Sequence, residues 1–433
     1  MEINPQAKEL NDSIIKSNKV VFNLLSEKGK AIFFPKKGIL SQSADAKGKK
    51  INATIGIALE EDKSPMRIDS VNKNITLEPE NVFPYAPSFG NPNIREKWKE
   101  KIFEKNKALK GKDISLPVVT NALTHGLSIA GYLFVDPDDE IISPDLFWGN
   151  YKLIFVNGYD TKIKTFETFK DEKFNISGLK EALKEGSKKK ILLLNFPNNP
   201  SGYTPTEEEA MQIISSIKEA AEAGKNILVL VDDAYFGLVY ENGIFEESIF
   251  GHLADIHENV LAVKIDGATK EDYVWGLRVG FLTYSIKNGN KDIYGPLEAK
   301  TAGAIRGNVS NVPNLSQSIL LEAYKDADYK EQKKEKFMLL KKRYTKLKET
   351  LKENSKYEEY FKALPFNSGY FMCIKLKAGM DSEALRQKLL SEYDTGVIVF
   401  DDLVRIAFSS VTMENIPDLF ENIYDACKKL EEN

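Results

Sequence analysis

The stretch KKKILLLNFPNNPSG, residues 188–202, decides the fold of this chain. It begins with a short, continuous apolar run that ends at Leu194, which is typical of a strand buried on both faces of a parallel sheet. The remainder, Asn195–Gly202, places two prolines among asparagines and predicts a rigid, irregular turn. Because only X–Pro bonds adopt the cis form at low cost, the bond from Asn199 to Pro200 is a candidate cis peptide.

The segment after this turn predicts a helix and then a second buried strand. Thr206 and Glu209 have the spacing of a capping box, and the apolar run ILVLVDDAYF, residues 227–236, follows the helix. A strand, a helix and a strand in this order predict an α/β fold with a mostly parallel central sheet flanked by helices. Ligands of such sheets collect at the carboxyl ends of the strands, where Asn195 and Asp232 stand.

The composition narrows the class of protein. The 433-residue chain has a formal net charge of −4 with its charges interspersed, so we expect no nucleic-acid partner. No apolar run approaches about 18 residues and the first residues carry no apolar core, so we expect no membrane span and no secretory signal. Cys373 and Cys427 are far apart and match no metal or redox spacing. This pattern predicts no metal site and favours a reducing, cytoplasmic setting.

The pattern of predicted secondary structure changes after the middle of the chain. Apolar residues recur at helical spacing between Phe337 and Leu351, which predicts a long amphipathic helix with an ordinary packed face. The strands and helices beyond it predict a smaller α+β domain. We therefore expect a large domain at residues 66–335 and a small domain formed by residues 1–65 and 336–433.

The order Asn-x-Pro-x-Asn-Pro-Ser-Gly at Asn195–Gly202 is highly specific. It resembles the class I/II aminotransferases, pyridoxal-phosphate enzymes of fold type I that include aspartate and aromatic aminotransferases. DDAY, which begins at Asp232 on the next strand end, resembles the Asp-x-Ala-Tyr motif of that family. The resemblance implies pyridoxal 5'-phosphate as the cofactor, with Asp232 at its pyridine nitrogen and Asn199 and Tyr235 at its phenolic oxygen. A buried acid at the nitrogen sustains the electron sink of the cofactor, whereas Asp233 is expected to cap or to face solvent.

A lysine and an arginine follow at the spacing of the family. In GATKEDYVWGLRVG, Lys270 matches the lysine that holds the cofactor as an internal aldimine, and Arg278 matches the arginine that grips the phosphate. Gly267 replaces one hydroxyl of the common Ser-x-Ser-Lys motif, whereas Thr269 keeps the other. We expect the remaining phosphate contacts to come from elsewhere in the chain.

Two acids directly follow this lysine. A surface lysine beside acids keeps its charge, whereas a Schiff-base lysine must have its neutral form accessible. The position of Lys270 in the motif favours the chemical role, so Glu271 and Asp272 should point away from the phosphate. Gly276 and Gly280 are expected to give the backbone room.

Two further segments match cofactor-binding parts of the family. A helix predicted from Thr124 onward offers free backbone N–H groups for the phosphate, and Leu123 and Thr124 stand where the family binds it. Trp148 is the best match to the ring that stacks on the cofactor, with Phe147 next in line. A tryptophan of the ordinary core is the alternative interpretation of Trp148.

The substrate residues are expected near both ends of the chain. Arg405 shares a predicted strand face with apolar residues and therefore needs an anion, which the resemblance identifies as the substrate α-carboxylate. Gly56 resembles a glycine that lines the substrate pocket, Phe371 an aromatic residue beside the substrate, and Asn199 contributes there too. Residues 34–50, which precede Gly56, are a candidate part of the substrate entrance.

Two residues suggest a homodimer. Tyr85 matches a tyrosine that reaches the phosphate of the neighbouring subunit, and Arg306 matches an arginine that binds the second carboxylate of a substrate across the interface. A structural or phosphate-shell salt bridge is an equal alternative for Arg306.

The resemblance implies a ping-pong aminotransferase that moves an amino group between an L-amino acid, dicarboxylic or aromatic, and a 2-oxo acid. Lys270 would shuttle the proton between the substrate and the cofactor, Asp232 and Tyr235 would act with it, and Arg405 would orient the substrate. A lyase or an aspartate β-decarboxylase on the same fold is the alternative, because the early chemistry is shared. A cofactor-sensing regulator is disfavoured, because the first 50 or so residues show no helix-turn-helix and the chain is not basic.

Overall fold

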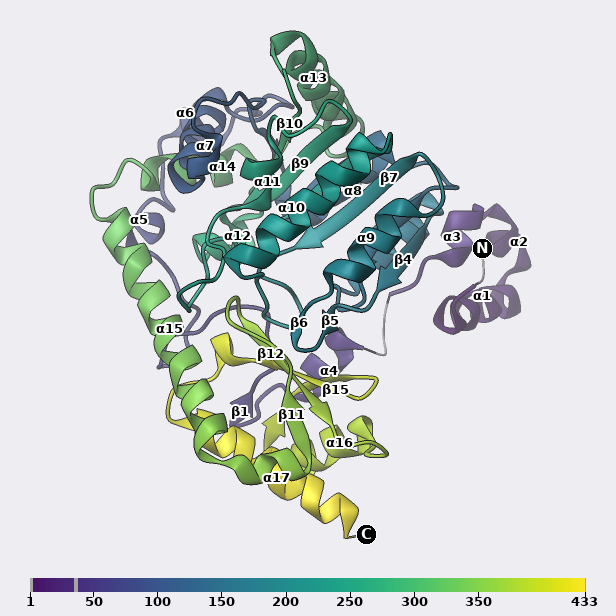
Figure 1. Ribbon diagram of the computed structural model, residues 1–433, viewed down its shortest axis with the longest axis vertical. Helices are drawn as coiled ribbons and strands as arrows, with labels where there is room; N and C mark the ends of the chain where they lie inside the picture. The colour runs from purple at the N-terminus through teal and green to yellow at the C-terminus, as the bar shows by residue number, and fades with distance from the viewer. Residues whose placement is uncertain (1–2, 35–37, 433) are drawn as a thin grey trace.

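The computed structural model describes residues 3–34 and 38–432 and contains a seven-stranded sheet (Figure 1). Its strands are parallel except for β10, which runs antiparallel to both of its neighbours. Their order across the sheet is β2 (Val118–Thr120), β10 (Gly280–Ser285), β9 (Val260–Gly267), β8 (Asn226–Asp232), β7 (Lys189–Asn195), β3 (Glu140–Pro144) and β4 (Lys162–Phe166). The predicted α/β fold with a mostly parallel sheet is confirmed.

The predicted strand, helix and strand at the centre of the chain are confirmed as β7, α10 (Glu207–Glu222) and β8. Thr206 and Glu209 form the expected capping box at the start of α10. The register pairs Asn195 with Asp232, so the two strands end side by side at one edge of the sheet. The Asn199–Pro200 bond is cis, as is Phe196–Pro197.

Helices cover the sheet, and Figure 1 shows α9 and α10 side by side in front of it. The helices of this part of the chain are α7 (Pro92–Lys105), α8 (Ala122–Phe134), α9 (Ile176–Lys184), α11 (Ile249–Leu253), α13 (Lys291–Asn308) and α14 (Asn314–Ala323). Shorter elements connect them: α5 (Asp69–Asn72), α6 (Pro79–Val82), η1 (Lys107–Leu109), the π-helical η2 (Lys152–Asn157), β5 (Phe169–Lys170), β6 (Lys173–Phe174), α12 (Ala268–Glu271) and η3 (Trp275–Leu277).

A second, four-stranded antiparallel sheet lies below the first in Figure 1. Its order is β11 (Phe361–Ala363), β12 (Phe371–Leu376), β15 (Leu403–Ala407) and β14 (Ile398–Phe400), with α16 (Ser382–Glu392), α17 (Asn415–Glu431), η4 (Ser355–Glu359) and η5 (Phe408–Ser410) around it. The long helix α15 (Tyr329–Glu353) runs beside both sheets in Figure 1. It buries Leu340, Tyr344 and Leu347, so the predicted amphipathic helix is confirmed.

The N-terminal segment has two parts. Helices α1 (Pro5–Ser17), α2 (Lys19–Leu24) and α3 (Glu27–Ala31) lie at the side of the large sheet, where Lys28 Nζ donates to the carbonyl of Gly158 at 2.6 Å (Figure 1). Farther along, α4 (Ile39–Asp45) precedes β1 (Ile51–Asn52), which pairs in parallel with β13 (Thr395–Gly396) near the small sheet. The predicted domain limits stay a prediction. Residues 35–37 of the predicted entrance segment lie outside the described residues.

Among the helices of residues 3–34 and 38–432, none is long and apolar enough to cross a membrane.

Candidate active site

A pocket of about 390 Å³ lies at the edge of the large sheet where β7 and β8 end. It brings together twelve of the predicted site residues: Gly56, Leu123, Thr124, Trp148, Asn199, Asp232, Tyr235, Thr269, Lys270, Arg278, Phe371 and Arg405. A second cavity of about 560 Å³ shares Trp148, Asn199 and Arg405 with it, and the other candidate ring, Phe147, lines this cavity. The two cavities therefore adjoin.

The carboxylate of Asp232 is fixed at the floor of the pocket. It is 3% exposed, and its two oxygens accept hydrogen bonds from Tyr151 Oη at 2.5 Å and from the Ala234 amide at 3.1 Å. The Asn195 side chain donates to the carbonyl of Asp232 at 2.8 Å, which holds the strand end in place. Burial raises the pKa of Asp232, while Tyr151 and the ammonium of Lys270 oppose that rise.

The amine of Lys270 enters the pocket from the short helix α12. Its Nζ lies 4.9 Å from the centre of the Tyr235 ring, and its main-chain carbonyl accepts a hydrogen bond from Tyr370 Oη at 3.2 Å. Burial lowers the pKa of Lys270 to about 8; Asp232 opposes this shift and Arg278 adds to it. A neutral amine is therefore accessible near neutral pH, as a nucleophilic lysine requires.

One side of the pocket is lined by hydrogen-bond donors that make few hydrogen bonds within the protein. The hydroxyl of Thr269 is buried and has no hydrogen-bond partner among residues 3–34 and 38–432. Arg278 adopts the left-handed conformation, with a φ of 54°. Its guanidinium donates one hydrogen bond, to the Trp275 carbonyl at 3.1 Å. Leu123 and Thr124 stand in the first turn of α8, whose free backbone N–H groups suit an anion. This side of the pocket can hold a phosphate.

The glycines around this site differ in their roles. A Cβ at Gly267 would lie 2.6 Å from the Val279 carbonyl and 2.7 Å from Gly280 Cα, so the close approach of β9 and β10 excludes the missing serine. Gly280 also packs against Ala122, with 2.7 Å from an added Cβ to the nearest backbone atom, as expected. For Gly276 the expectation is wrong, because nothing in the described chain lies within 4 Å of an added Cβ.

Arg405 lies on β15, is 3% exposed and reaches the same pocket. It donates to Asn199 Oδ1 at 3.2 Å and to the carbonyl of Thr54 at 3.3 Å, and its guanidinium carbon lies 4.4 Å from the centre of the Phe371 ring. Its Nε is buried without a partner in the described part of the chain. A buried guanidinium with no carboxylate on it is suited to an anionic ligand.

Two predicted site residues lie outside this pocket. Tyr85 is 91% exposed, and Arg306 is exposed on α13. No hydrogen bond or ion pair links Arg306 to another residue that the structure describes, so a salt bridge within the chain does not explain it. Their roles at an interface between subunits stay predictions.

The expectation for Asp233 is wrong. This residue is 4% exposed and neither caps a helix nor faces solvent. Its carboxylate pairs with the ammonium of Lys264, which is 1% exposed, and accepts from Ser248 Oγ at 2.6 Å. The pairing of β8 with β9 brings Lys264 to this place, and the spacing of residues in DDAY carries no sign of it.

Sequence reasoning missed two residues of the site. Tyr151 bonds the Asp232 carboxylate, and its only sequence signal is its place three residues after Trp148, one helical turn away. Trp275 lines the pocket, and its indole Nε1 is buried without a partner in residues 3–34 and 38–432. No residue pattern marks Trp275 as a pocket residue.

The residues present fit pyridoxal phosphate. The pocket volume lies within the range of small-molecule sites, roughly 300–1,000 Å³. A buried carboxylate, a lysine with accessible neutral form and the unpartnered Thr269 hydroxyl correspond to the pyridine nitrogen, the aldehyde and the phosphate of that molecule.

Comparisons with known proteins agree with this fit. The chain is 30% identical over 263 residues to an aspartate aminotransferase of Bacillus sp. (strain YM-2), a match that covers 59% of each chain. A solved aminotransferase of Anaerococcus prevotii has a TM-score of 0.83 and 26% identity, and the match covers 93% of this chain and 99% of that one. A mitochondrial aspartate aminotransferase of Trypanosoma brucei shares the fold, with a TM-score of 0.72 and 21% identity over 89% of this chain and 98% of that one.

The match to the Bacillus enzyme thus spans about three fifths of that curated relative. The family model described as aminotransferase class I and II matches residues 49–423, which is most of the chain. The resemblance predicted from the motifs, its fold type and its cofactor are therefore confirmed: this chain belongs to the class I and II aminotransferases, a family of pyridoxal-phosphate-dependent enzymes.

Proposed function

We propose that this protein is an aminotransferase that moves an amino group between an L-amino acid and a 2-oxo acid. The observation that carries the proposal is the meeting of Lys270, Asp232 and Arg405 in one pocket, although they come from three different strands or helices. Lys270 and Asp232 suit the cofactor, and Arg405 suits the carboxylate that both substrates share. The family membership supports the same reaction type.

The residues divide the work as follows. Pyridoxal phosphate, when bound, supplies an electron sink for the bonds at the substrate α-carbon. Asp232, held by Tyr151, keeps a negative charge against the ring nitrogen. Asn199 and Tyr235 would hold the phenolic oxygen of the cofactor, and Trp148 would pack against its ring.

The proton moves through one amine. Lys270 Nζ would take the proton from the substrate α-carbon and hold it as an ammonium until it returns the proton in the same pocket. Thr269, Arg278 and the backbone at Leu123 and Thr124 would hold the phosphate and so keep the cofactor in place beside Lys270.

Arg405 orients the substrate. Its planar fork binds the α-carboxylate with two charge-assisted hydrogen bonds, and Phe371 packs on the face of the guanidinium. Gly56 leaves space on the open side of the pocket, since nothing in the described chain lies within 4 Å of a Cβ added there.

We also propose two domains and a homodimer. The two separate sheets support a large domain at residues 66–335 and a small domain from residues 1–65 and 336–433. The exposure of Tyr85 and Arg306 supports a partner subunit that covers them. The two buried, free cysteines support a cytoplasmic setting.

The substrate class depends on Arg306. An arginine that crosses to the pocket of a partner would bind the side-chain carboxylate of aspartate or glutamate, whereas the aromatic rings around the pocket suit an aromatic donor. A panel of amino donors with 2-oxoglutarate, run on wild type and on Arg306→Ala, decides between them. Unchanged turnover of aspartate and glutamate in the variant contradicts the role of Arg306.

The function itself is tested at Lys270. Lys270→Ala should lose both transamination and the absorbance band of the covalently bound cofactor, between about 360 and 430 nm. An unchanged spectrum in the variant contradicts the assignment of Lys270. If wild type instead forms alanine from aspartate without any added 2-oxo acid, it is a β-decarboxylase.

A further inference from the structure

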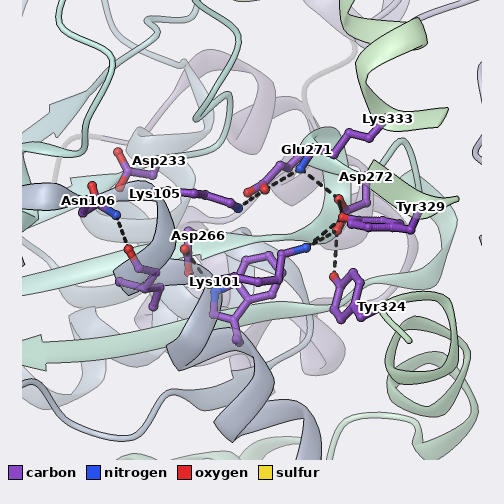
Figure 2. A network of polar contacts seen from close by, with 12 residues as sticks. Lys101, Lys105, Asn106, Asp233, Asp266, Glu271, Asp272, Tyr324, Tyr329 and Lys333 are labelled. Atoms are coloured by element: carbon purple, nitrogen blue, oxygen red, sulfur yellow. Dashed lines mark hydrogen bonds and ion pairs between the residues drawn. The ribbon is translucent and has the colours of Figure 1, made fainter. Parts of the chain in front are cut away.

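The two acids that follow Lys270 are buried behind the pocket. Glu271 is 5% exposed and Asp272 is 0% exposed, and both face away from the cavity that the Lys270 amine enters. Figure 2 shows them facing lysines and tyrosines of neighbouring helices. The function proposed above gives these residues no task.

Asp272 is surrounded by donors. Tyr324 Oη donates to Oδ2 at 2.7 Å, and Tyr329 Oη donates to Oδ1. The ammonium of Lys333 lies 3.2 Å from Oδ1 and that of Lys101 lies 3.8 Å from Oδ2. These contacts therefore fix both the position and the orientation of the Asp272 carboxylate.

Glu271 is bound by two further ammonium contacts. Lys105 pairs with its carboxylate, and Lys333 Nζ lies 2.6 Å from the same oxygen. Burial alone would raise the pKa of Glu271, but Lys105 and Lys333 hold it well below its ordinary value. Lys333 thus bridges both acids.

These partners come from two helices with the same spacing. Lys101 and Lys105 are four residues apart on α7, and Tyr329 and Lys333 are four apart in the first turns of α15. Side chains four apart share one face of a helix. Each helix therefore turns one face toward the short helix α12, which carries Lys270.

Stability alone is a weak explanation for this network. Three ammonium groups face two buried carboxylates; Lys101 is buried, whereas the side chains of Lys105 and Lys333 are 27% and 25% exposed. Lys101 also lies 3.7 Å from the centre of the Tyr324 ring (Figure 2). Apolar residues of similar volume often stabilise a core as well as or better than buried ions, because ions lose their hydration. What ion pairs add is a fixed geometry between the groups that they join.

The helix α15 continues from this network to the strand of Arg405. Arg343, 0% exposed on α15, donates to the carbonyl of Ser409 at 2.6 Å, and Ser409 lies in η5 directly after β15. About 15 Å of helix separates Arg343 from Lys333, at 1.5 Å per residue. One helix thus contacts both the turn of Lys270 and η5, the short helix that directly follows the strand of Arg405.

We propose that Glu271 and Asp272 are positioning residues, whose buried carboxylates hold the turn bearing Lys270 against α7 and α15 through ion pairs and hydrogen bonds. These contacts fix the Lys270 amine relative to Arg405, so that it faces a substrate held by its carboxylate. This inference rests on the proposed function, since that reaction is what requires a fixed amine.

The first test uses Lys333, which touches both acids but not the pocket. In Lys333→Met we expect kcat to fall about 10- to 100-fold, the effect of misplacing a catalytic group by about 1 Å. The KM of the amino acid should change by less than about threefold, because Arg405 is untouched. Lys333→Arg keeps the charge and both contacts and should restore kcat to within about threefold of wild type.

A second readout does not depend on turnover. The double variant Asp272→Asn/Lys333→Met removes one charge of each sign, so its net charge equals that of wild type. We expect the pH midpoint of the visible cofactor absorbance to move by more than about 0.3 pH unit, because the Lys270 amine no longer has a single environment.

The matched control is Glu298→Gln, which breaks the ion pair of Glu298 with Arg95 between α13 and α7, outside the pocket. It should lower the thermal midpoint while kcat and the absorbance midpoint stay at wild-type values. Suppose that the Lys333→Met and double variants lose stability like this control but keep the wild-type kcat and absorbance midpoint. The network is then only structural, and the proposal is wrong. If the double variant does not fold, the two Lys333 variants decide.

The two proposals fail in different ways. A wild-type protein without any cofactor absorbance contradicts the proposed function. A wild-type protein with normal absorbance and turnover, whose network variants match it in both, contradicts only the positioning role.

Discussion

At the scale of the residue, Lys270 and its two acidic neighbours occupy opposite environments. The amine of Lys270 reaches the pocket, where burial lowers its pKa, whereas Glu271 and Asp272 are paired behind it. The acids therefore do not hold the lysine in its charged form, although they adjoin it in sequence. The expectation that they point away from the phosphate side of the pocket agrees with these contacts.

The amine of Lys270 should titrate at about pH 8 in the cofactor-free chain. Reaction with an acylating reagent over a range of pH, followed by peptide mass spectrometry, measures this midpoint. Between about pH 8 and the ordinary value of 10.5, the folded state binds fewer protons at Lys270 than the unfolded chain. The contribution of Lys270 to the free energy of unfolding should therefore rise with pH across that window, relative to Lys270→Met. A midpoint near 10.5 contradicts the desolvation of this amine.

Arg405 should be sensitive even to a change that keeps its charge. In Arg405→Lys the planar fork is lost, and with charged hydrogen bonds worth about 1.5–3 kcal/mol each, kcat/KM for amino acids should fall about 10- to 100-fold. Steady-state kinetics measures this loss. The control is Arg386→Lys, another buried arginine, which pairs with Glu383 and Asp45 outside the pocket. Equal losses in both variants would refute a specific role for Arg405.

At the scale of the element, the pairing of β8 with β9 determines which residue pairs with Asp233. The register places Lys264 opposite Val231, so its ammonium reaches Asp233 and also lies 3.3 Å from Asp266. A reading of one strand at a time cannot detect this ion pair, because its members lie on different strands. Asp232, its neighbour in sequence, instead reaches the pocket.

The turn at Asn195–Gly202 is fixed by contact with β12. Gly202 has a φ of +73°, and a Cβ there would lie 1.8 Å from the carbonyl oxygen of Phe371. Gly202→Ala should therefore cost about 3 kcal/mol or more, from the strained φ and the overlap together. Gly237→Ala is the matched control, because Gly237 has a φ of +82° and nothing in the described chain within 4 Å. It should cost only about 1 kcal/mol. Urea denaturation of both variants measures the difference, and equal losses contradict the packing argument.

At the scale of the whole molecule, one face carries unusually exposed aromatic residues. Phe83 is 82% exposed and Tyr85 is 91% exposed. Ser88, shortly after them, donates to the carbonyl of Ser310 at 2.8 Å, so this segment lies beside the end of α13 that carries Arg306. This arrangement supports the proposed dimer.

Phe83→Glu should convert the proposed dimer to the 48.8 kDa monomer, because a charge would be desolvated in the interface. It should also weaken retention of the cofactor, since Tyr85 would no longer reach the phosphate of a partner. Mass measurement by light scattering checks the first effect and dialysis checks the second. Met338→Glu is the control, as Met338 is 42% exposed on α15. A wild-type monomer contradicts the dimer outright.

Much of the fold was predictable because its signals are local. Apolar runs gave β7 and β8, the capping box gave the start of α10, and helical spacing gave α15. Helices α1–α3 were not predicted, because their residues are mostly exposed and show little of the periodic burial that marks a helix.

The sequence by itself determined the order and spacing of the chemical groups: the turn at Asn195–Gly202, then Asp232, then Lys270 and Arg278. Only the tertiary structure decided which of them meet and in what state. Arg405 bonds Asn199 across 206 positions of sequence. Burial lowers the pKa of Lys270, because a pKa depends on desolvation and on neighbouring charges, and these arise through space rather than along the chain.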